Sequence, residues 1–359
     1  MIDTRRVDDL AWRVMRWSMV LLCVSLVLAT IRVPYAIEAP GPVSDTLASR
    51  GEGSSAQRVV DVEGHRTYPT SGHLYFTTVT VQGGPEEHIT LWEWVLGKVD
   101  RDAKVVPEQT VFGTGRSEEE IQQLNAAEMQ GSQKSAIAVA LRSTGEDVPQ
   151  DNVVASIAGD LPADGRLELK DEVTAVDGVT TEHVSDVVAA ISDREPGEDV
   201  RLTVRRKGAE REITLRTADL GGGRAGIGVG LEPLFDYPYE VRIDAGEVGG
   251  PSAGTMVALA VRDLVTPGEM TGGRSVAGTG TIDDSGQVGP IGGIRQKMIG
   301  ARDAGAQYFL APTDNCDEVA GHVPDGLTVL EVDDFDAAVD AVEGAAKGEV
   351  GDLPSCGTR

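Results

Sequence analysis

The pattern of hydrophobic and polar residues predicts a first helix close to the start of the chain. Residues 17–31, WSMVLLCVSLVLATI, carry no charge and are framed by Arg13, Arg16 and Arg32. A helix needs about 20 apolar residues to cross a bilayer, and residues 12–35 reach that length if the arginines extend back to the interface. More basic residues precede the run than follow it, which predicts a single-pass anchor with a cytoplasmic N-terminus and the remaining chain outside. A cleaved signal peptide is the alternative.

The next part of the chain has a weaker pattern. Residues 37–58 are rich in Pro, Gly and Ser and have no sustained period, which predicts a linker. Further on, β-branched and aromatic residues alternate over 73–84 and predict a strand that runs into a turn. Ser117 and Glu120 have the spacing of a capping box and predict the start of a helix. The segment 59–144, which contains both elements, shows no residue pattern that indicates a particular chemistry.

A second unit, residues 145–217, has the pattern of a small β-rich domain. Apolar residues on one side of 184–191 predict an amphipathic helix, and two strand patterns predict a hairpin that turns at Lys207 and Gly208. This order of elements resembles a PDZ domain of the bacterial protease-associated type. Such domains add an extended peptide to a sheet edge and hold its terminal carboxylate. Lys170 stands where the family usually has glycine, which would loosen that loop, and a packing domain without a ligand is the alternative.

Residues 225–345 place a serine at a helix start and a lysine on an apolar helix face. Ser252, in EVGGPSAGTMVALAV, precedes an apolar run that predicts a buried helix, whose free N–H groups would stabilise an anion. An ordinary helix-capping serine is the alternative. Lys297 stands three residues after Ile294 and four before Ala301, on the apolar face of a predicted helix, so we expect desolvation to lower its pKa toward that of a general base. A lysine that packs its stem and reaches water is the alternative.

Charge and residue spacing exclude several other classes of function. The chain has 32 basic and 58 acidic residues, a formal net charge of -26, which opposes binding to nucleic acid. The five histidines have no metal-binding or catalytic spacing, so we expect neither a metal site nor a cofactor. Cys316 and Cys356 could pair in an oxidising compartment, and two free thiols are the alternative.

The motifs GGPSAG, AGTGTI and GPIGGIRQK occur in this order and together resemble the proteolytic domain of the Lon peptidase family over residues 225–345. The resemblance implies a ribosomal-S5-like α+β fold and a catalytic dyad of Ser252 and Lys297. In such a dyad the serine attacks a peptide carbonyl to form an acyl-enzyme.

Supporting roles follow from the neighbours of the dyad. Backbone N–H groups around Gly250 and Ala253 are candidates for stabilising the oxyanion. Thr279 and Thr281, on the strand before the lysine helix, are candidates to accept a hydrogen bond from the lysine amine. Ordinary strand threonines are the alternative for this pair.

The whole chain resembles the bacterial membrane-anchored PDZ-containing Lon-like proteases, a multidomain α+β class. The predicted units are the following: 1–36, cytoplasmic N-terminus and transmembrane helix; 37–58, linker; 59–144, outer segment; 145–217, PDZ-like domain; 225–345, proteolytic domain; 346–359, tail. Because no phosphate-binding loop is present, we expect an ATP-independent endopeptidase that cleaves extracytoplasmic proteins or unfolded segments. Its partners would be protein or peptide substrates, and the ring assemblies of Lon enzymes imply a homo-oligomer. A membrane-anchored PDZ adaptor without hydrolytic activity is the alternative.

Overall fold

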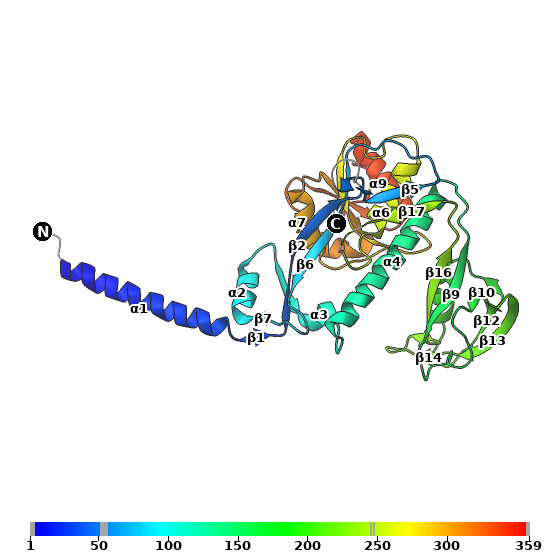
Figure 1. Ribbon diagram of the computed structural model, residues 1–359, viewed down its shortest axis with the longest axis horizontal. Helices are drawn as coiled ribbons and strands as arrows, with labels where there is room; N and C mark the ends of the chain where they lie inside the picture. Colours follow the sequence, from blue (N-terminus) through cyan, green and yellow to red (C-terminus); the bar gives the residue numbers. More distant parts are fainter. Residues whose placement is uncertain (1–3, 51–56, 245, 247, 357–359) are drawn as a thin grey trace.

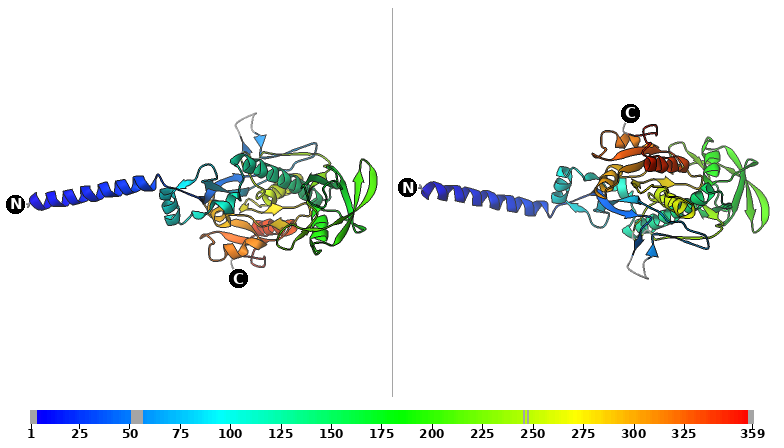
Figure 2. Two further views of the ribbon diagram at one scale, coloured as in Figure 1. Left: turned by 90° about the horizontal axis from the view of Figure 1, so that it is seen from below. Right: turned by 90° about the horizontal axis from the view of Figure 1, so that it is seen from above.

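The computed structural model describes residues 4–50, 57–244, 246 and 248–356 (Figure 1). Its N-terminal helix α1 (Thr4–Leu28) projects away from the rest of the protein in all the views of Figures 1 and 2. The remaining elements form a mixed α/β body and a smaller β-rich domain. This arrangement agrees with the predicted multidomain α+β class, apart from the membrane helix.

The predicted transmembrane helix is wrong. None of the helices in the described residues combines the length and the apolar character needed to cross a bilayer. The uncharged part of α1 extends only from residue 17 to residue 28, about 18 Å of helix, and the chain then turns into the short strand β1 (Arg32–Val33). The assignment to the cell membrane, with an extracytoplasmic protease domain, depended on that helix and is wrong with it.

A six-stranded sheet forms the centre of the body. One of its two middle strands, β6, comes from residues 59–144, the segment in which the sequence indicates no particular chemistry. Four neighbouring strands, β22, β21, β18 and β6, are parallel, and β2 runs antiparallel to β6 and to β8. In sheet order these strands are β22 (Thr328–Val332), β21 (Tyr308–Pro312), β18 (Ser275–Gly278), β6 (His73–Gln82), β2 (Tyr35–Asp45) and β8 (Lys104–Pro107).

Helices cover both faces of this sheet, because successive residues of a strand point to opposite sides. Val276 packs with the helices α4 (Glu118–Ser143), α6 (Gly254–Val265) and α9 (Phe335–Lys347). Its neighbour Ala277 packs instead with α7 (Ile294–Asp303) and α8 (Cys316–Val319) on the opposite face. The buried helix α6, the capping box of Ser117 and Glu120, and the strand β6 confirm the sequence predictions for these elements.

Strands of the body also come from the stretch 37–58, predicted as a linker, and from the segment 59–144. The Pro- and Gly-rich stretch lies within β2, where the pairing with β6 shifts between Pro40 and Val43. Such a shift is a bulge, the usual place for proline and glycine inside a sheet. A Cβ atom on Gly41 would lie 2.8 Å from the backbone carbonyl of Thr78, so the close approach of the two strands requires glycine.

The smaller domain is an antiparallel sheet with a core of its own. Its strand order is β13, β12, β10, β9 and β16, and β11 pairs with β10. The elements are β9 (Gln150–Ile157), β10 (Glu172–Val176), β11 (Val179–Thr180), α5 (Val184–Ser192), β12 (Asp199–Arg206), β13 (Ala209–Arg216) and β16 (Val229–Phe235). The predicted helix and the hairpin at Lys207 and Gly208 are confirmed.

Lys170 does not loosen its loop. It adopts the left-handed conformation that glycine favours, with φ 70°, and its N–H donates to the carbonyl of Val154 at 2.9 Å. The buried carboxylate of Asp171 accepts hydrogen bonds from the N–H of Glu168 and from Arg206. The loop thus keeps its hydrogen bonds at a conformational cost of about 1 kcal/mol.

Short elements complete the chain. They are β3 (Ser49–Arg50), β4 (Gln57–Arg58), β5 (Val60–Glu63), β7 (Ile89–Thr90), α2 (Leu91–Val99), α3 (Glu108–Phe112), β14 (Ala218–Asp219), β15 (Ala225–Gly226), β17 (Glu240–Ile243), β19 (Thr281–Ile282), β20 (Val288–Gly289) and a 3-10 turn at Thr313–Asn315. The β19–β20 hairpin turns at residues 283–286.

Candidate active site

Ser252 lies in the turn just before α6, and hydrogen bonds fix its backbone from two directions. The Ser252 carbonyl accepts hydrogen bonds from the N–H of Gly280 and from Thr279 Oγ1, both at 2.9 Å. The carbonyl of the preceding Pro251 accepts a hydrogen bond from Ser132 Oγ at 2.8 Å. Since Ser132 belongs to α4 and the other donors follow β18, the turn is held between two separate parts of the body.

The candidate oxyanion donors differ in availability. The Gly250 N–H donates to the carbonyl of Asn125 at 3.1 Å, so in this conformation it is already occupied. Within the described part of the chain, the N–H groups of Ser252 and Ala253 form no hydrogen bond with the backbone. They precede the first turn of α6, where the helix dipole favours negative charge. Ala253 is therefore better placed than Gly250 to stabilise an oxyanion.

Lys297 lies on α7 and is almost fully buried. Only 3% of the residue is exposed. Its Nζ donates a hydrogen bond to Thr279 Oγ1 at 2.9 Å. Burial lowers the pKa of Lys297 to about 7, because the charged amine loses its hydration. An amine with this pKa exchanges its proton near neutral pH, as a general base must.

Thr279 connects the lysine to the serine turn. Its hydroxyl accepts the hydrogen bond from Lys297 Nζ and donates its proton to the Ser252 carbonyl, which uses both capacities of a hydroxyl group. Thr279 is completely buried, and this geometry agrees with its predicted place beside the amine. Thr281 instead lines the cleft, and its carbonyl receives only a long contact of 3.5 Å from Thr255 Oγ1.

Ser252 and Lys297 line one cleft of about 570 Å³. Among the described residues, no hydrogen bond joins Ser252 Oγ to Lys297 Nζ. The cleft also contains side chains that the sequence analysis did not single out, among them Glu38, Val79, Val81 and Asn125. They come from β2, β6 and α4, so no local pattern near the serine could have indicated them.

A disulfide lies behind this cleft. The structure joins Cys316 and Cys356, both buried, whereas Cys23 on α1 is an exposed thiol. Asn315, next to the disulfide, exchanges two hydrogen bonds of 2.9 Å with the backbone of Ile291, which lines the cleft. The disulfide therefore links the C-terminal segment to the support of one cleft wall.

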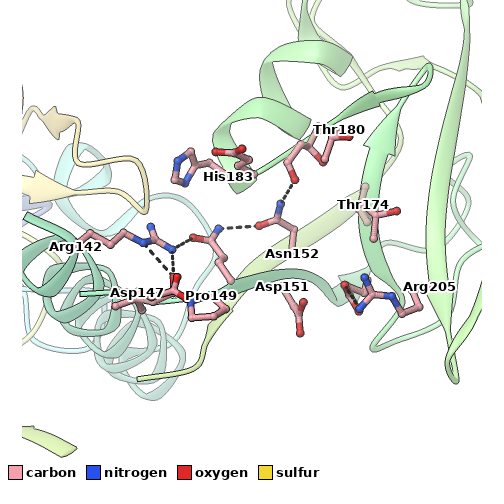
Figure 3. Close-up of a pocket in the computed structure, with 15 residues that line it drawn as sticks. Arg142, Asp147, Pro149, Asp151, Asn152, Thr174, Thr180, His183 and Arg205 are labelled. Carbon is pink, nitrogen blue, oxygen red and sulfur yellow. Dashed lines mark hydrogen bonds and ion pairs between the residues drawn. The ribbon is translucent and has the colours of Figure 1, made fainter. Parts of the chain in front are cut away.

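A second cavity, of about 530 Å³, lies where the small domain meets the end of α4 (Figure 3). A chain of hydrogen bonds crosses it from Arg142 to Gln150, from Gln150 to Asn152 and from Asn152 to the carbonyl of Thr181. Asp284, in the turn of the β19–β20 hairpin, accepts hydrogen bonds from Gln150 and from the N–H of Val184, which begins α5. The hydrogen bonds around this cavity therefore join the small domain to α4 and to the β19–β20 hairpin.

Comparison with known families assigns the two domains. Residues 240–343 match the family model of the Lon protease (S16) C-terminal proteolytic domain. The chain carries a Lon-type proteolytic domain. Residues 132–217 match the family model of the PDZ domain, so the small β-rich domain is of the PDZ type. The Lon-type match begins at β17, whereas β2, β6 and β8 complete the sheet from outside the matched range.

Individual relatives agree with the Lon assignment. Lon protease 1 of Bacillus subtilis is 29% identical over 184 residues, which cover 49% of this chain and 24% of that protein. The Lon protease of Frankia alni is 37% identical over 112 residues, covering 30% and 13% respectively. The Lon protease of Rhizobium meliloti is 32% identical over 170 residues, covering 45% and 20%. The chain thus matches less than a quarter of the length of each relative, and the matches support a peptidase.

A PDZ domain of an SdrC-like protein from Listeria monocytogenes is 22% identical, with a TM-score of 0.22, and the match covers 22% of this chain and 85% of that chain.

Proposed function

We propose that the protein is an ATP-independent serine endopeptidase that uses Ser252 as nucleophile and Lys297 as general base. The observation that carries the proposal is the buried amine of Lys297, whose pKa is lowered to about 7 and which is one hydroxyl group away from the Ser252 backbone. The match of residues 240–343 to the Lon proteolytic domain supports it. The sequence has no phosphate-binding loop of the G-x-x-x-x-G-K-[ST] type, which supports independence from ATP.

The reaction begins with a proton transfer from Ser252 Oγ to the neutral amine of Lys297. The lysine stem rotates its Nζ from Thr279 toward Ser252 when substrate fills the cleft, since catalytic hydrogen bonds often tighten only in the complex. The alkoxide then attacks a peptide carbonyl, and the N–H groups of Ser252 and Ala253 stabilise the oxyanion. Lys297 returns the proton to the leaving amine, and water hydrolyses the acyl-enzyme.

An extended segment of a substrate fits the sheet beside the cleft. The pairing of β6 with β18 ends at Phe76, while β6 continues to Gln82 with β2 as its neighbour on the other side. Val79 and Val81, in that continuation, line the cleft. A peptide that adds to this edge of β6 would pass the nucleophile as a strand. The PDZ-type domain would recruit substrates through their C-termini.

Hydrolysis of an unstructured protein without nucleotide tests this proposal. We expect Ser252→Ala and Lys297→Met each to lower the rate by about 10² to 10⁴-fold, and the double variant to lose little more, because the two groups act as a unit. The exposed residues Ser192 and Lys347 provide matched controls as Ser192→Ala and Lys347→Met. The rate of the wild type should rise up to about pH 7 and then level off, as the amine loses its proton.

Three results would contradict the proposal. Cleavage by Ser252→Ala at the wild-type rate would show that another residue is the nucleophile. A strict requirement for nucleotide would contradict ATP independence. An inert wild type that still binds protein partners would favour a non-catalytic adaptor.

A further inference from the structure

Glu38 is the acidic side chain of the cleft that holds Ser252. Of the described residues that line this cleft, only Glu38 and Lys297 are ionisable. The other lining residues are apolar, small or uncharged, and Val79 and Val81 of β6 are among them. The carboxylate of Glu38 is therefore the group of this lining that could pair with a cation.

The strand register fixes the position of Glu38. On β2 it lies opposite Val81 of β6 and opposite Lys104 of β8. Residues that are paired across neighbouring strands project from the same face of a sheet, so Glu38 and Val81 form one patch on the cleft wall. Val81 remains 36% exposed, so the apolar part of this patch is accessible from the cleft.

Lys104 lies opposite Glu38 and acts on its charge, but within the described residues the two side chains form no ion pair. Burial raises the pKa of Glu38, the charge of Lys104 acts in the opposite direction, and Glu318 raises it further. Within the described residues, no basic side chain comes within ion-pair distance of this carboxylate. The pKa of Lys297, the basic side chain of the same cleft, is lowered by burial of its amine.

We propose that Glu38 forms a substrate subsite that takes a lysine or arginine side chain. The cationic head would pair with the carboxylate, and the aliphatic stem would pack on Val81 and Val79. This inference rests on the proposed endopeptidase function and adds a substrate class to it: extended segments with a basic residue at a fixed distance from the scissile bond. Lys104 competes for the same carboxylate, so its removal would strengthen the preference.

Peptide cleavage by the full chain tests the subsite. Internally quenched peptides of one unstructured sequence would carry a single Lys, Gln or Glu at each position around the scissile bond. Their C-termini would be amidated, so that no terminal carboxylate is offered to the PDZ-type domain. At one position we expect the wild type to cleave the Lys peptide about ten-fold faster than the Gln peptide, the effect of one charge-assisted hydrogen bond.

Three variants separate the subsite from general effects on the protein. In Glu38→Gln the ratio of Lys to Gln cleavage should fall to about one, and in Glu38→Lys the Glu peptide should become the preferred substrate. Glu210→Gln, at an exposed position of β13, is the matched control and should keep the wild-type ratio. Equal cleavage of the three peptides at every position, or an unchanged ratio in Glu38→Gln, would overturn the subsite.

A binding measurement separates failure of the subsite from failure of the peptidase. The Ser252→Ala variant cannot hydrolyse peptides under the proposed mechanism, and its affinity for the same peptides is measurable by fluorescence anisotropy. The subsite is supported if Ser252→Ala binds the Lys peptide selectively and the double variant Ser252→Ala, Glu38→Gln does not. This holds even if the wild type proves inert. Equal affinity for the Lys, Gln and Glu peptides would overturn it even if the wild type is an active peptidase.

Discussion

Lys297 and Arg142 are both basic side chains withdrawn from water, but the protein satisfies them in different ways. Arg142 donates hydrogen bonds to the carbonyl of Val148 and to the side chain of Gln150 (Figure 3). It also donates a hydrogen bond to the carbonyl of Asp284. Lys297 donates to the single hydroxyl of Thr279. Burial lowers the pKa of both groups, but in Arg142 the nearby charge of Asp284 counteracts the shift.

The difference shows which of the two cations is structural. The hydrogen bonds of Arg142 join α4, the chain leading into β9 and the β19–β20 hairpin, so its charge holds several elements together. Within the part of the chain that the structure describes, the Lys297 amine donates one hydrogen bond, and its pKa is lowered, so its neutral form is accessible at neutral pH. Keeping a buried amine with so few partners costs stability, a cost typical of functional sites.

The largest expected effect is a pH-dependent contribution of Lys297 to stability. Its pKa is about 7 in the folded protein and 10.5 as an ordinary lysine, so between these values the unfolded state binds more protons. Raising the pH through this window therefore stabilises the folded state. Relative to Lys297→Met, the unfolding free energy of the wild type should rise by about 1.4 kcal/mol per pH unit, or about 4 kcal/mol over three units.

Denaturant unfolding at several pH values between 7 and 10 measures this difference. The exposed Lys347→Met provides the control, since its difference from the wild type should stay constant over the same range. A constant difference for Lys297→Met as well would show that the Lys297 amine titrates normally, and would remove it as a general base.

Arg142 should show the opposite balance between stability and activity. Arg142→Met leaves the carbonyls of Val148 and Asp284 without this donor, and we expect a loss of about 3 kcal/mol in unfolding free energy. Hydrolysis of a short unstructured peptide should stay close to the wild-type rate, because Arg142 does not line the Ser252 cleft. Arg201→Met, at an exposed position of β12, is the matched control. An unchanged stability would contradict the structural role of the Arg142 network.

The elements that carry Ser252 and Lys297 could be predicted from sequence because their signals are local. The apolar run of α6 and the apolar face of α7 each occupy one short stretch of chain. The sheet around them could not be predicted in the same way. β2 carries Pro and Gly at a bulge, which hides the alternation of a strand, and β6 pairs in parallel with β18, about two hundred residues further along the chain.

The sequence analysis missed Glu38 and misjudged α1 for two different reasons. Glu38 belongs to a stretch that reads as a linker, and only the register of β2 with β6 brings it to the cleft. For α1 the sequence offers an uncharged run of residues, but the position where the helix ends decides how much of that run is helical. That position, Leu28, precedes the end of the run at residue 31.

The smallest expected effect concerns Thr279, which positions Lys297 by accepting its hydrogen bond. Thr279→Val removes this acceptor and also the donor to the Ser252 carbonyl, and we expect the hydrolysis rate to fall about ten-fold.

Because the hydroxyl stabilises the charged amine, its loss should also move the midpoint of the pH–rate profile to lower pH. Thr279→Ser retains the hydroxyl and should restore both the rate and the midpoint. A purely structural threonine would lower stability without moving the midpoint, so a pH–rate profile that keeps its midpoint in Thr279→Val would contradict the positioning role.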